Sequence, residues 1–133
     1  MSIITIGQTT SFVNAYIECA LWSSTGPSDE PLDDTYSAED FTDTARQAMQ
    51  DDCESFLKEC GPVFIRHAIA NDRDVASINY TQHGHDFWLT RNGHGAGYWD
   101  RGYGALGDDM TSISEPYGSC NIYPTDKGQL DIN

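Results

Sequence analysis

The segment from His85 to Gly104, HDFWLTRNGHGAGYWDRGYG, constrains the fold most, because it gathers two of the three tryptophans and two of the four histidines around an Asn-Gly pair. Aromatic and branched residues occupy His85 to Arg91, Asn92-Gly93 follows, and a second run ends at Trp99. Asn-Gly between two such runs is typical of a β-hairpin with a type I′ turn, which needs positive φ at both central residues. The sequence therefore predicts a hairpin here.

The predicted hairpin has two faces, because side chains alternate along a strand. Phe87, Leu89 and Tyr98 share one face, which suits a core, and Trp88 and Trp99 lie on the other. A two-residue loop and a four-residue loop give the same faces in different registers, so the register stays open. The tryptophan face is either covered by another element or exposed for binding.

The N-terminal half shows mainly helical periodicity. Ser2 to Ile6 favours a short strand. A helix follows, with Thr9 or Ser11 as the N-cap and an end near Trp22 or Ser23. Its apolar face comprises Phe12, Val13, Tyr16, Ile17, Ala20 and Leu21. Ser37 and Asp40 have the spacing of a capping box, which predicts that a long helix follows. The apolar stripe of that helix comprises Phe41, Ala45, Ala48 or Met49, Cys53, Phe56, Leu57 and Cys60. Gly61-Pro62 marks a stop or a kink, after which residues 63–70 form another short helix.

The C-terminal half predicts strands and one helix. Val75 to Tyr80 favours a strand, and Leu106 to Glu115 favours a helix ended by the Pro-Tyr-Gly that follows. Cys120 to Tyr123 and Gln129 to Ile132 favour two short strands around a turn. Helices outside one antiparallel sheet make an α+β fold. We therefore predict a single α+β domain, 1–133, in which a small antiparallel sheet with a central hairpin packs against two to four helices.

Charge narrows the range of partners. Twenty-one acidic residues against seven basic ones give the 133-residue chain a net charge of −14. Such a field repels nucleic acid and membrane surfaces and attracts basic partners. We expect no direct nucleic-acid binding and no membrane association. The four cysteines have no zinc-site spacing, so we interpret them as reduced, mostly buried thiols of an intracellular protein.

Negative charge is concentrated between Asp29 and Glu59, where eleven acids and two bases leave a local charge of −9. Regularly placed carboxylates can imitate the phosphates of duplex DNA. The predicted partner-binding acidic face consists of Asp29, Glu30, Asp33, Asp34, Glu39, Asp40, Asp43, Asp51 and Glu54. The alternative is an ordinary solvated helix face.

Polar residues around the predicted hairpin form a candidate ligand pocket. Its members are His85, Trp88, Arg91, Asn92, His94, Trp99, Asp100 and Arg101. An arginine can fork to a carboxylate or phosphate, and a tryptophan face can take a base or a cation. The same side chains would equally form a hydrogen-bonded network that stabilises the fold.

The sequence contains little evidence for a catalytic site or a metal site. His83, His85 and Asp86 form HxHD, in which two His of one strand could share a metal ion, but no further His completes a convincing ligand set. A nucleophile elbow, a P-loop and a dinucleotide fingerprint are not found in the sequence. We expect no metal, no cofactor and no enzymatic activity.

Three motifs together identify a resemblance. AYIECALW at Ala15 to Trp22, DCESFL at Asp52 to Leu57, and HDFWLTRNGHGAGYWDRG at His85 to Gly102 resemble a family of small proteins encoded by bacteriophages and prophages. The resemblance covers most of the chain and carries no catalytic residues. It implies an accessory phage protein in the cytoplasm of the infected bacterial host.

Charge and resemblance together predict a function. We expect a protein that binds and inhibits a host nucleic-acid-handling defence complex, of the anti-CRISPR or antirestriction type, through a DNA-mimicking acidic face. The partner would be a host protein with a basic nucleic-acid-binding surface. The alternatives are a nucleotide-sequestering protein that uses the hairpin pocket and an accessory protein of the virion.

Overall fold

The computed structural model describes residues 4–25, 29–93, 98 and 104–133. The α-helices of this part are α1 (Ile6–Ser23), α2 (Asp43–Ala70), α3 (Tyr80–Arg91) and α4 (Ala105–Ser114). The strands are β1 (Ile122–Pro124) and β2 (Leu130–Ile132), and short 3-10 helices are η1 (Leu32–Asp34), η2 (Ala38–Asp40), η3 (Val75–Ser77) and η5 (Glu115–Tyr117). The chain is thus mostly helical with a small antiparallel sheet, which confirms the α+β class.

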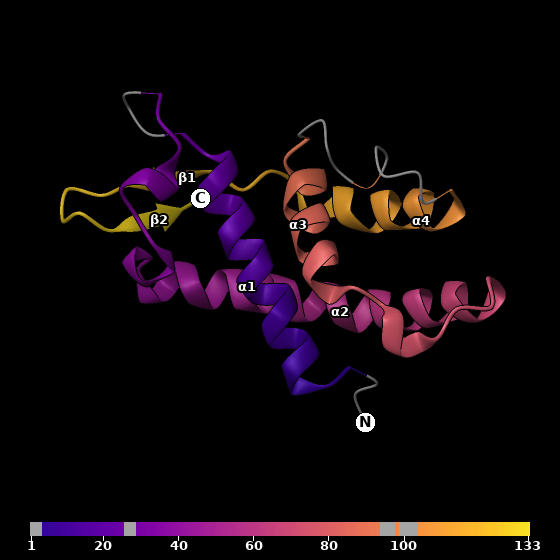
Figure 1. Ribbon diagram of the computed structural model, residues 1–133. Coiled ribbons are helices and arrows are strands. Elements are labelled where there is room, and N and C mark those ends of the chain that lie inside the picture. The colour runs from indigo at the N-terminus through magenta and orange to yellow at the C-terminus, as the bar shows by residue number, and fades with distance from the viewer. Residues whose placement is uncertain (1–3, 26–28, 94–97, 99–103) are drawn as a thin grey trace.

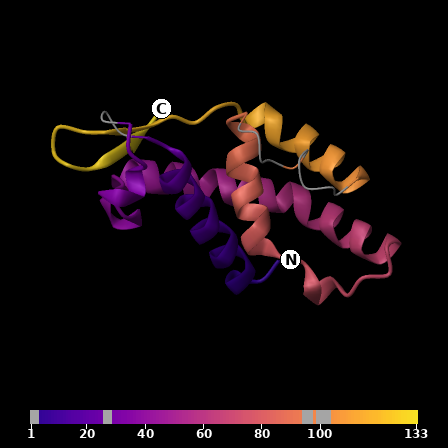
Figure 2. The same ribbon diagram turned by 45° about the horizontal axis from the view of Figure 1, so that its top comes forward.

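The long helix α2 supports the other elements. Helices α1 and α3 pack side by side across it, and α4 packs against its C-terminal half (Figures 1 and 2). The small sheet lies near the other end of α2, where Phe41 forms a bridge with Leu130 and the backbone N–H of Thr42 donates to the Leu130 carbonyl at 2.9 Å. None of the helices in the described ranges has the length and apolar character needed to cross a membrane.

The first helix begins earlier than predicted. Its N-cap is Thr5, whose side chain accepts from the N–H of Gln8 while the Gln8 side chain accepts from the N–H of Thr5. Ile6 therefore belongs to α1 rather than to a strand, and the predicted N-caps Thr9 and Ser11 lie inside the helix. The predicted apolar face is confirmed, because Phe12, Val13, Tyr16, Ala20 and Leu21 are all buried.

The second helix keeps its predicted stripe from Ala45 to Cys60 but changes its ends, and Phe41, predicted to belong to the stripe, is buried before the helix begins. The capping box of Ser37 and Asp40 is present, but it caps η2, and α2 begins after Thr42, whose hydroxyl accepts from the N–H of Ala45. Met49 rather than Ala48 is buried in the stripe. The helix also continues through Pro62 to Ala70 instead of stopping. Pro62 is exposed, so water can reach the carbonyl that its missing N–H leaves unpaired.

The predicted central hairpin is wrong, because its first run forms α3. Tyr80, His83, Gly84, Phe87 and Arg91 are buried at helical spacing, and the side chain of Asn79 caps the helix by accepting from the N–H of Gln82. A short apolar run fits both periods, and alternation alone does not decide between them. The Asn-Gly pair ends the helix, with Gly93 at φ +70°, a common helix-ending conformation. The predicted strand at 75–80 is likewise replaced by η3 and the start of α3.

The hairpin of this fold lies at the C-terminus instead. The predicted helix at 106–115 is confirmed as α4, and the two predicted short strands pair as β1 and β2, with Tyr123 opposite Asp131. Gly128 in the connecting turn has φ +76°. Each strand buries one residue, Ile122 in β1 and Leu130 in β2, and β2 contacts α2.

Helices α1 and α3 approach each other closely at Gly84. A Cβ atom added there would overlap the backbone carbonyl oxygen of Phe12 and lie 3.1 Å from the Cβ of Ala15. Gly84 lies inside α3, where glycine is otherwise unfavourable. The glycine is therefore required by packing rather than by backbone conformation.

We expect Gly84→Ala to lower the free energy of unfolding by about 1–3 kcal/mol, because α1 and α3 must separate. Urea unfolding would measure the change. Gly7→Ala is the matched control, since its added Cβ meets no atom closer than Thr5 Oγ1 at 3.9 Å. Equal stability of the two variants would contradict the packing argument.

Candidate functional site

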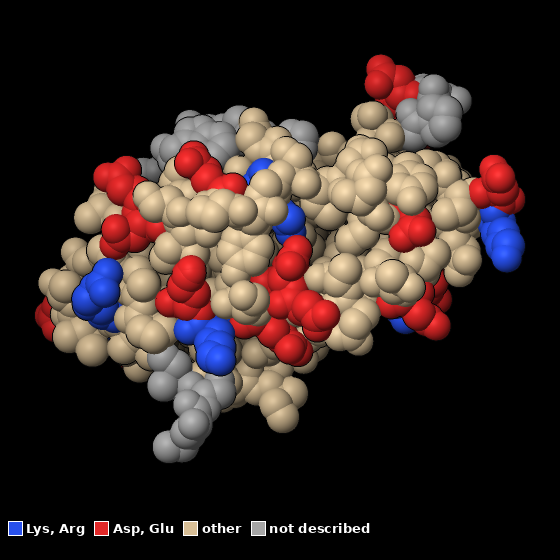
Figure 3. All heavy atoms as spheres, turned by 180° about the vertical axis from the view of Figure 1, so that it is seen from behind, with Lys and Arg blue, Asp and Glu red and all other residues tan. Residues whose placement is uncertain are grey.

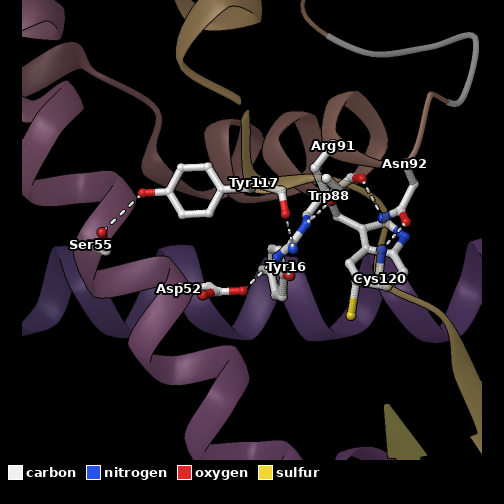
Figure 4. Close-up of polar contacts among 9 residues, drawn as sticks. Tyr16, Asp52, Ser55, Trp88, Arg91, Asn92, Tyr117 and Cys120 are labelled. Atoms are coloured by element: carbon white, nitrogen blue, oxygen red, sulfur yellow. Dashed lines mark hydrogen bonds and ion pairs between the residues drawn. The ribbon is translucent and has the colours of Figure 1, made fainter. Parts of the chain in front are cut away.

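The strongest polar arrangement in the described part of the chain surrounds the guanidinium of Arg91 (Figure 4). Its Nη1 donates to Asp52 Oδ2 at 2.7 Å and to the hydroxyl of Tyr16 at 3.0 Å. Its Nε and Nη2 donate to the carbonyl oxygens of Gly118 at 2.8 Å and of Tyr117 at 3.0 Å. One side chain on α3 thus binds α1, α2 and the segment after α4.

Burial makes these contacts strong. Only 8% of Arg91 is exposed, and its guanidinium carbon lies 5.7 Å from the ring centroids of Phe87 and of Tyr117. Burial alone would lower the pKa of Arg91, but Tyr16 and Asp52 raise it overall. Burial also raises the pKa of Tyr16, so its hydroxyl stays protonated. Arg91 is therefore a permanent cation satisfied by fixed acceptors.

Neighbouring contacts extend this network. The indole Nε1 of Trp88 donates to Ser23 Oγ at 2.8 Å, and the side-chain oxygen of Asn92 accepts from the N–H of Cys120 at 2.7 Å. The ring of Phe87, over which the guanidinium of Arg91 lies, stacks on the ring of Phe56 with centroids 3.9 Å apart. The ends of α1 and α3 and the start of the C-terminal segment are held together in this way.

Some residues of the predicted ligand pocket belong to the Arg91 network, and others lie outside the described residues. Trp88 and Arg91 are buried, and His85 and Asn92 are half-buried. His94, Trp99, Asp100 and Arg101 lie outside the described residues. The contacts of Trp88, Arg91 and Asn92 favour the alternative in which these side chains stabilise the fold.

Sequence reasoning missed the partners of Arg91. Tyr16 was interpreted only as part of an apolar face, and Asp52 only as one acid of an acidic segment. The available signal was that Asp52 directly precedes Cys53 in the buried stripe, which places its carboxylate at the border of the core. The acceptors at Tyr117 and Gly118 are backbone carbonyls, which every residue has, so the side-chain types in the sequence do not predict them.

The acidic face is largely exposed. Seven of its nine members are exposed, and Glu30 and Asp40 are half-buried. Asp40 accepts from the backbone N–H of Ser37, and on α2 Asp51 and Glu54 each accept from a glutamine one turn earlier. On the side of the molecule opposite to that of Figure 1, acidic side chains gather in several groups with Lys and Arg between them (Figure 3).

The helical form of α3 also changes the HxHD motif. Residues two apart on a helix point about 200° apart, so His83 and His85 do not share a face as they would on a strand. His83 instead stacks on Phe64, with centroids 4.0 Å apart, and its Nδ1 lies 3.0 Å from the hydroxyl of Tyr98. Within the described ranges, no three His, Cys, Asp or Glu side chains are grouped to hold a metal ion.

The cysteines are buried free thiols, as predicted. Burial raises the pKa of Cys53, Cys60 and Cys120. Because the thiolate is the reactive form, these thiols are poor nucleophiles at neutral pH.

Comparison of the chain with models of protein families, with curated proteins and with solved structures finds no match.

We expect Arg91→Met to lower the free energy of unfolding by about 3 kcal/mol or more, since it removes the buried donor of Tyr16, Asp52 and the carbonyl oxygens of Tyr117 and Gly118. Arg91→Lys should cost about 2 kcal/mol, because one ammonium cannot reproduce the fork. Asp52→Asn should cost less than about 1 kcal/mol, since the Asp52 side chain is 42% exposed.

Urea unfolding of these variants tests the order of the three costs. Arg46→Met is the control, because Arg46 is an exposed arginine of α2 and its loss should change stability by about 0.5 kcal/mol or less. If Arg91→Met were as stable as Arg46→Met, the central role of the network would be disproved.

Burial lowers the pKa of His83 from 6.5 to about 4. Between these pH values the unfolded chain protonates this imidazole and the folded chain does not. Acidification through this window therefore removes stability, by up to about 1.4 kcal/mol per pH unit.

His83→Phe keeps a ring against Phe64 but does not titrate. Between pH 7 and pH 5 the wild-type protein should lose about 2 kcal/mol more stability than this variant. Urea unfolding at both pH values measures the difference, and equal losses would show that His83 is not the titrating group.

Proposed function

We propose that this chain is a phage accessory protein that binds a host nucleic-acid-handling defence complex and blocks it through the acidic face. The observation that carries the proposal is the exposure of seven of the nine carboxylates of that face in a chain of net charge −14. Exposed like charges without basic partners favour association with a basic surface, and they speed it by electrostatic steering.

The fold supports this use of the acidic segment. Residues 29–42 pack through Leu32 and Phe41, both buried, while Asp33, Asp34 and Glu39 remain exposed. Helix α2 likewise turns its stripe inward and leaves Asp43, Asp51 and Glu54 outside. The carboxylates are thus carried on an ordered surface, which lowers the entropic cost of binding.

Charge spacing limits how far the surface imitates DNA. Asp43 and Glu54 lie about 16 Å apart along the axis of α2. Duplex DNA carries one charge per about 1.7 Å, so α2 alone is several times sparser than DNA. Mimicry therefore needs the 29–40 segment as well as α2, and the proposed contact covers both.

The motifs at Ala15, Asp52 and His85 support the phage context through their resemblance to proteins of phages and prophages. An inhibitor of a host complex acts in the cytoplasm of the infected cell, where that complex is found. The proposal assigns no catalytic residue and no cofactor.

The test is capture of partners by the tagged protein from nuclease-treated lysate of the bacterial host, at low and moderate salt. The expected result is one basic nucleic-acid-binding complex, released as salt rises. The variant with Asp33→Asn, Asp34→Asn, Asp51→Asn and Glu54→Gln should recover at least about tenfold less of it, because rim charges set electrostatic attraction.

A second variant controls for total charge. Glu18→Gln, Asp72→Asn, Glu115→Gln and Asp126→Asn also remove four exposed negative charges, but outside the acidic face. This variant should capture the complex as the wild-type protein does. Equal loss in both variants would show that only net charge matters, and no loss in either would disprove the acidic face as the binding surface.

A further inference from the structure

A cavity of about 250 Å³ lies where the C-terminal end of α2, the segment 71–79, the start of α3 and α4 meet. Phe64 and His67 come from α2, His83 from α3 and Leu106 from α4. The cavity shares no residue with the Arg91 network or with the acidic face. Its volume is near the lower end for small-molecule sites, which suits a ligand of one or two rings.

The charge of the lining is opposite to that of the chain. Arg73 and two of the four histidines line the cavity, and none of its described lining residues is Asp or Glu, although the chain has three times as many acids as bases. His67 Nε2 lies 2.8 Å from Asp109 Oδ2, outside the lining. Arg73 is exposed, and its guanidinium forms no hydrogen bond or ion pair with the described residues. The N–H groups of the Arg73 guanidinium are therefore available to bind an anion.

The rest of the lining suits a flat apolar body. Ala68, Ile78 and Leu106 contribute aliphatic surface. The ring of Phe64 is held by His83 at 4.0 Å on one side and by the edge of Tyr80 at 5.9 Å. Burial lowers the pKa of His83, so this imidazole is neutral at pH 7 and adds no charge to the cavity, whereas Arg73 carries a permanent positive charge there.

We propose that this cavity binds a small molecule that combines a planar ring with one carboxylate or phosphate group. The ring lies among Phe64, Ile78 and Leu106, and the anionic group pairs with Arg73. This site is independent of the proposed binding of a host complex, and either can fail without the other.

Amide chemical shifts of the full chain, recorded by NMR during titration, provide the test. The probes are 2-naphthoate and adenosine 5′-monophosphate, with 2-naphthamide, adenosine, acetate and inorganic phosphate as partial ligands. At least one ring anion should give saturable shifts at cavity residues, and its uncharged analogue should bind about tenfold more weakly or worse. Binding of naphthoate alone assigns a carboxylate ligand, and binding of the nucleotide alone assigns a phosphate ligand. If neither shifts these residues at millimolar concentration, the proposal is wrong.

Three variants locate the site. Arg73→Gln should weaken the ring anion about tenfold or more and leave its neutral analogue unchanged, because it removes only the charged partner. Ala68→Leu fills the cavity and should weaken both. Lys127→Gln removes one positive charge from the distant β1–β2 turn and should weaken neither. Equal effects of Arg73→Gln and Lys127→Gln would overturn the proposal.

Discussion

Burial of one arginine is the interaction on which this fold depends. Desolvating a guanidinium is costly unless every face of it meets an acceptor or a ring. Arg91 meets this condition with Asp52, the hydroxyl of Tyr16 and two backbone carbonyls, while its guanidinium carbon lies over two aromatic rings. The acceptors come from three separate parts of the chain: Tyr16 from α1, Asp52 from α2, and the two carbonyls from residues 117–118. The cost of leaving Arg91 unpaired therefore favours one arrangement of α1, α2, α3 and the C-terminal segment over other compact packings of the same apolar faces.

This arrangement separates the molecule into regions with different roles. The interior holds the Arg91 network and a continuous aromatic core in which Phe56 and Phe87 stack. The acidic segment is attached through buried apolar residues and leaves most of its carboxylates exposed. At the far end of α2, the segment 71–79 borders a cavity whose described lining residues include an arginine and no acid. A strongly acidic protein thus has one surface suited to basic partners and one small hollow suited to an anion.

The misassigned hairpin shows where sequence reasoning fails in physical terms. His85 to Arg91 is short and contains aromatic residues at positions that satisfy both a period of two and a period of 3.6. Asn-Gly is common both in type I′ turns and at the C-terminal ends of helices. Only tertiary contacts separate the two states: Gly84 allows α3 to pack directly on the backbone of α1, and a strand would not bring Arg91 to its acceptors. Much of the candidate pocket was consequently placed on the wrong element.

The sequence by itself determined the class of fold, the apolar stripes of α1 and α2, helix α4, the C-terminal strands and the concentration of exposed acids, because each depends on local periodicity or on composition. The tertiary structure alone decided that Arg91 is a structural cation rather than a free ligand-binding group, since its partners Tyr16 and Asp52 lie far away in the chain. It alone also placed Arg73, Phe64 and His83 around one cavity. Contacts between distant segments depend on how helices cross, and no local pattern in the sequence encodes that geometry.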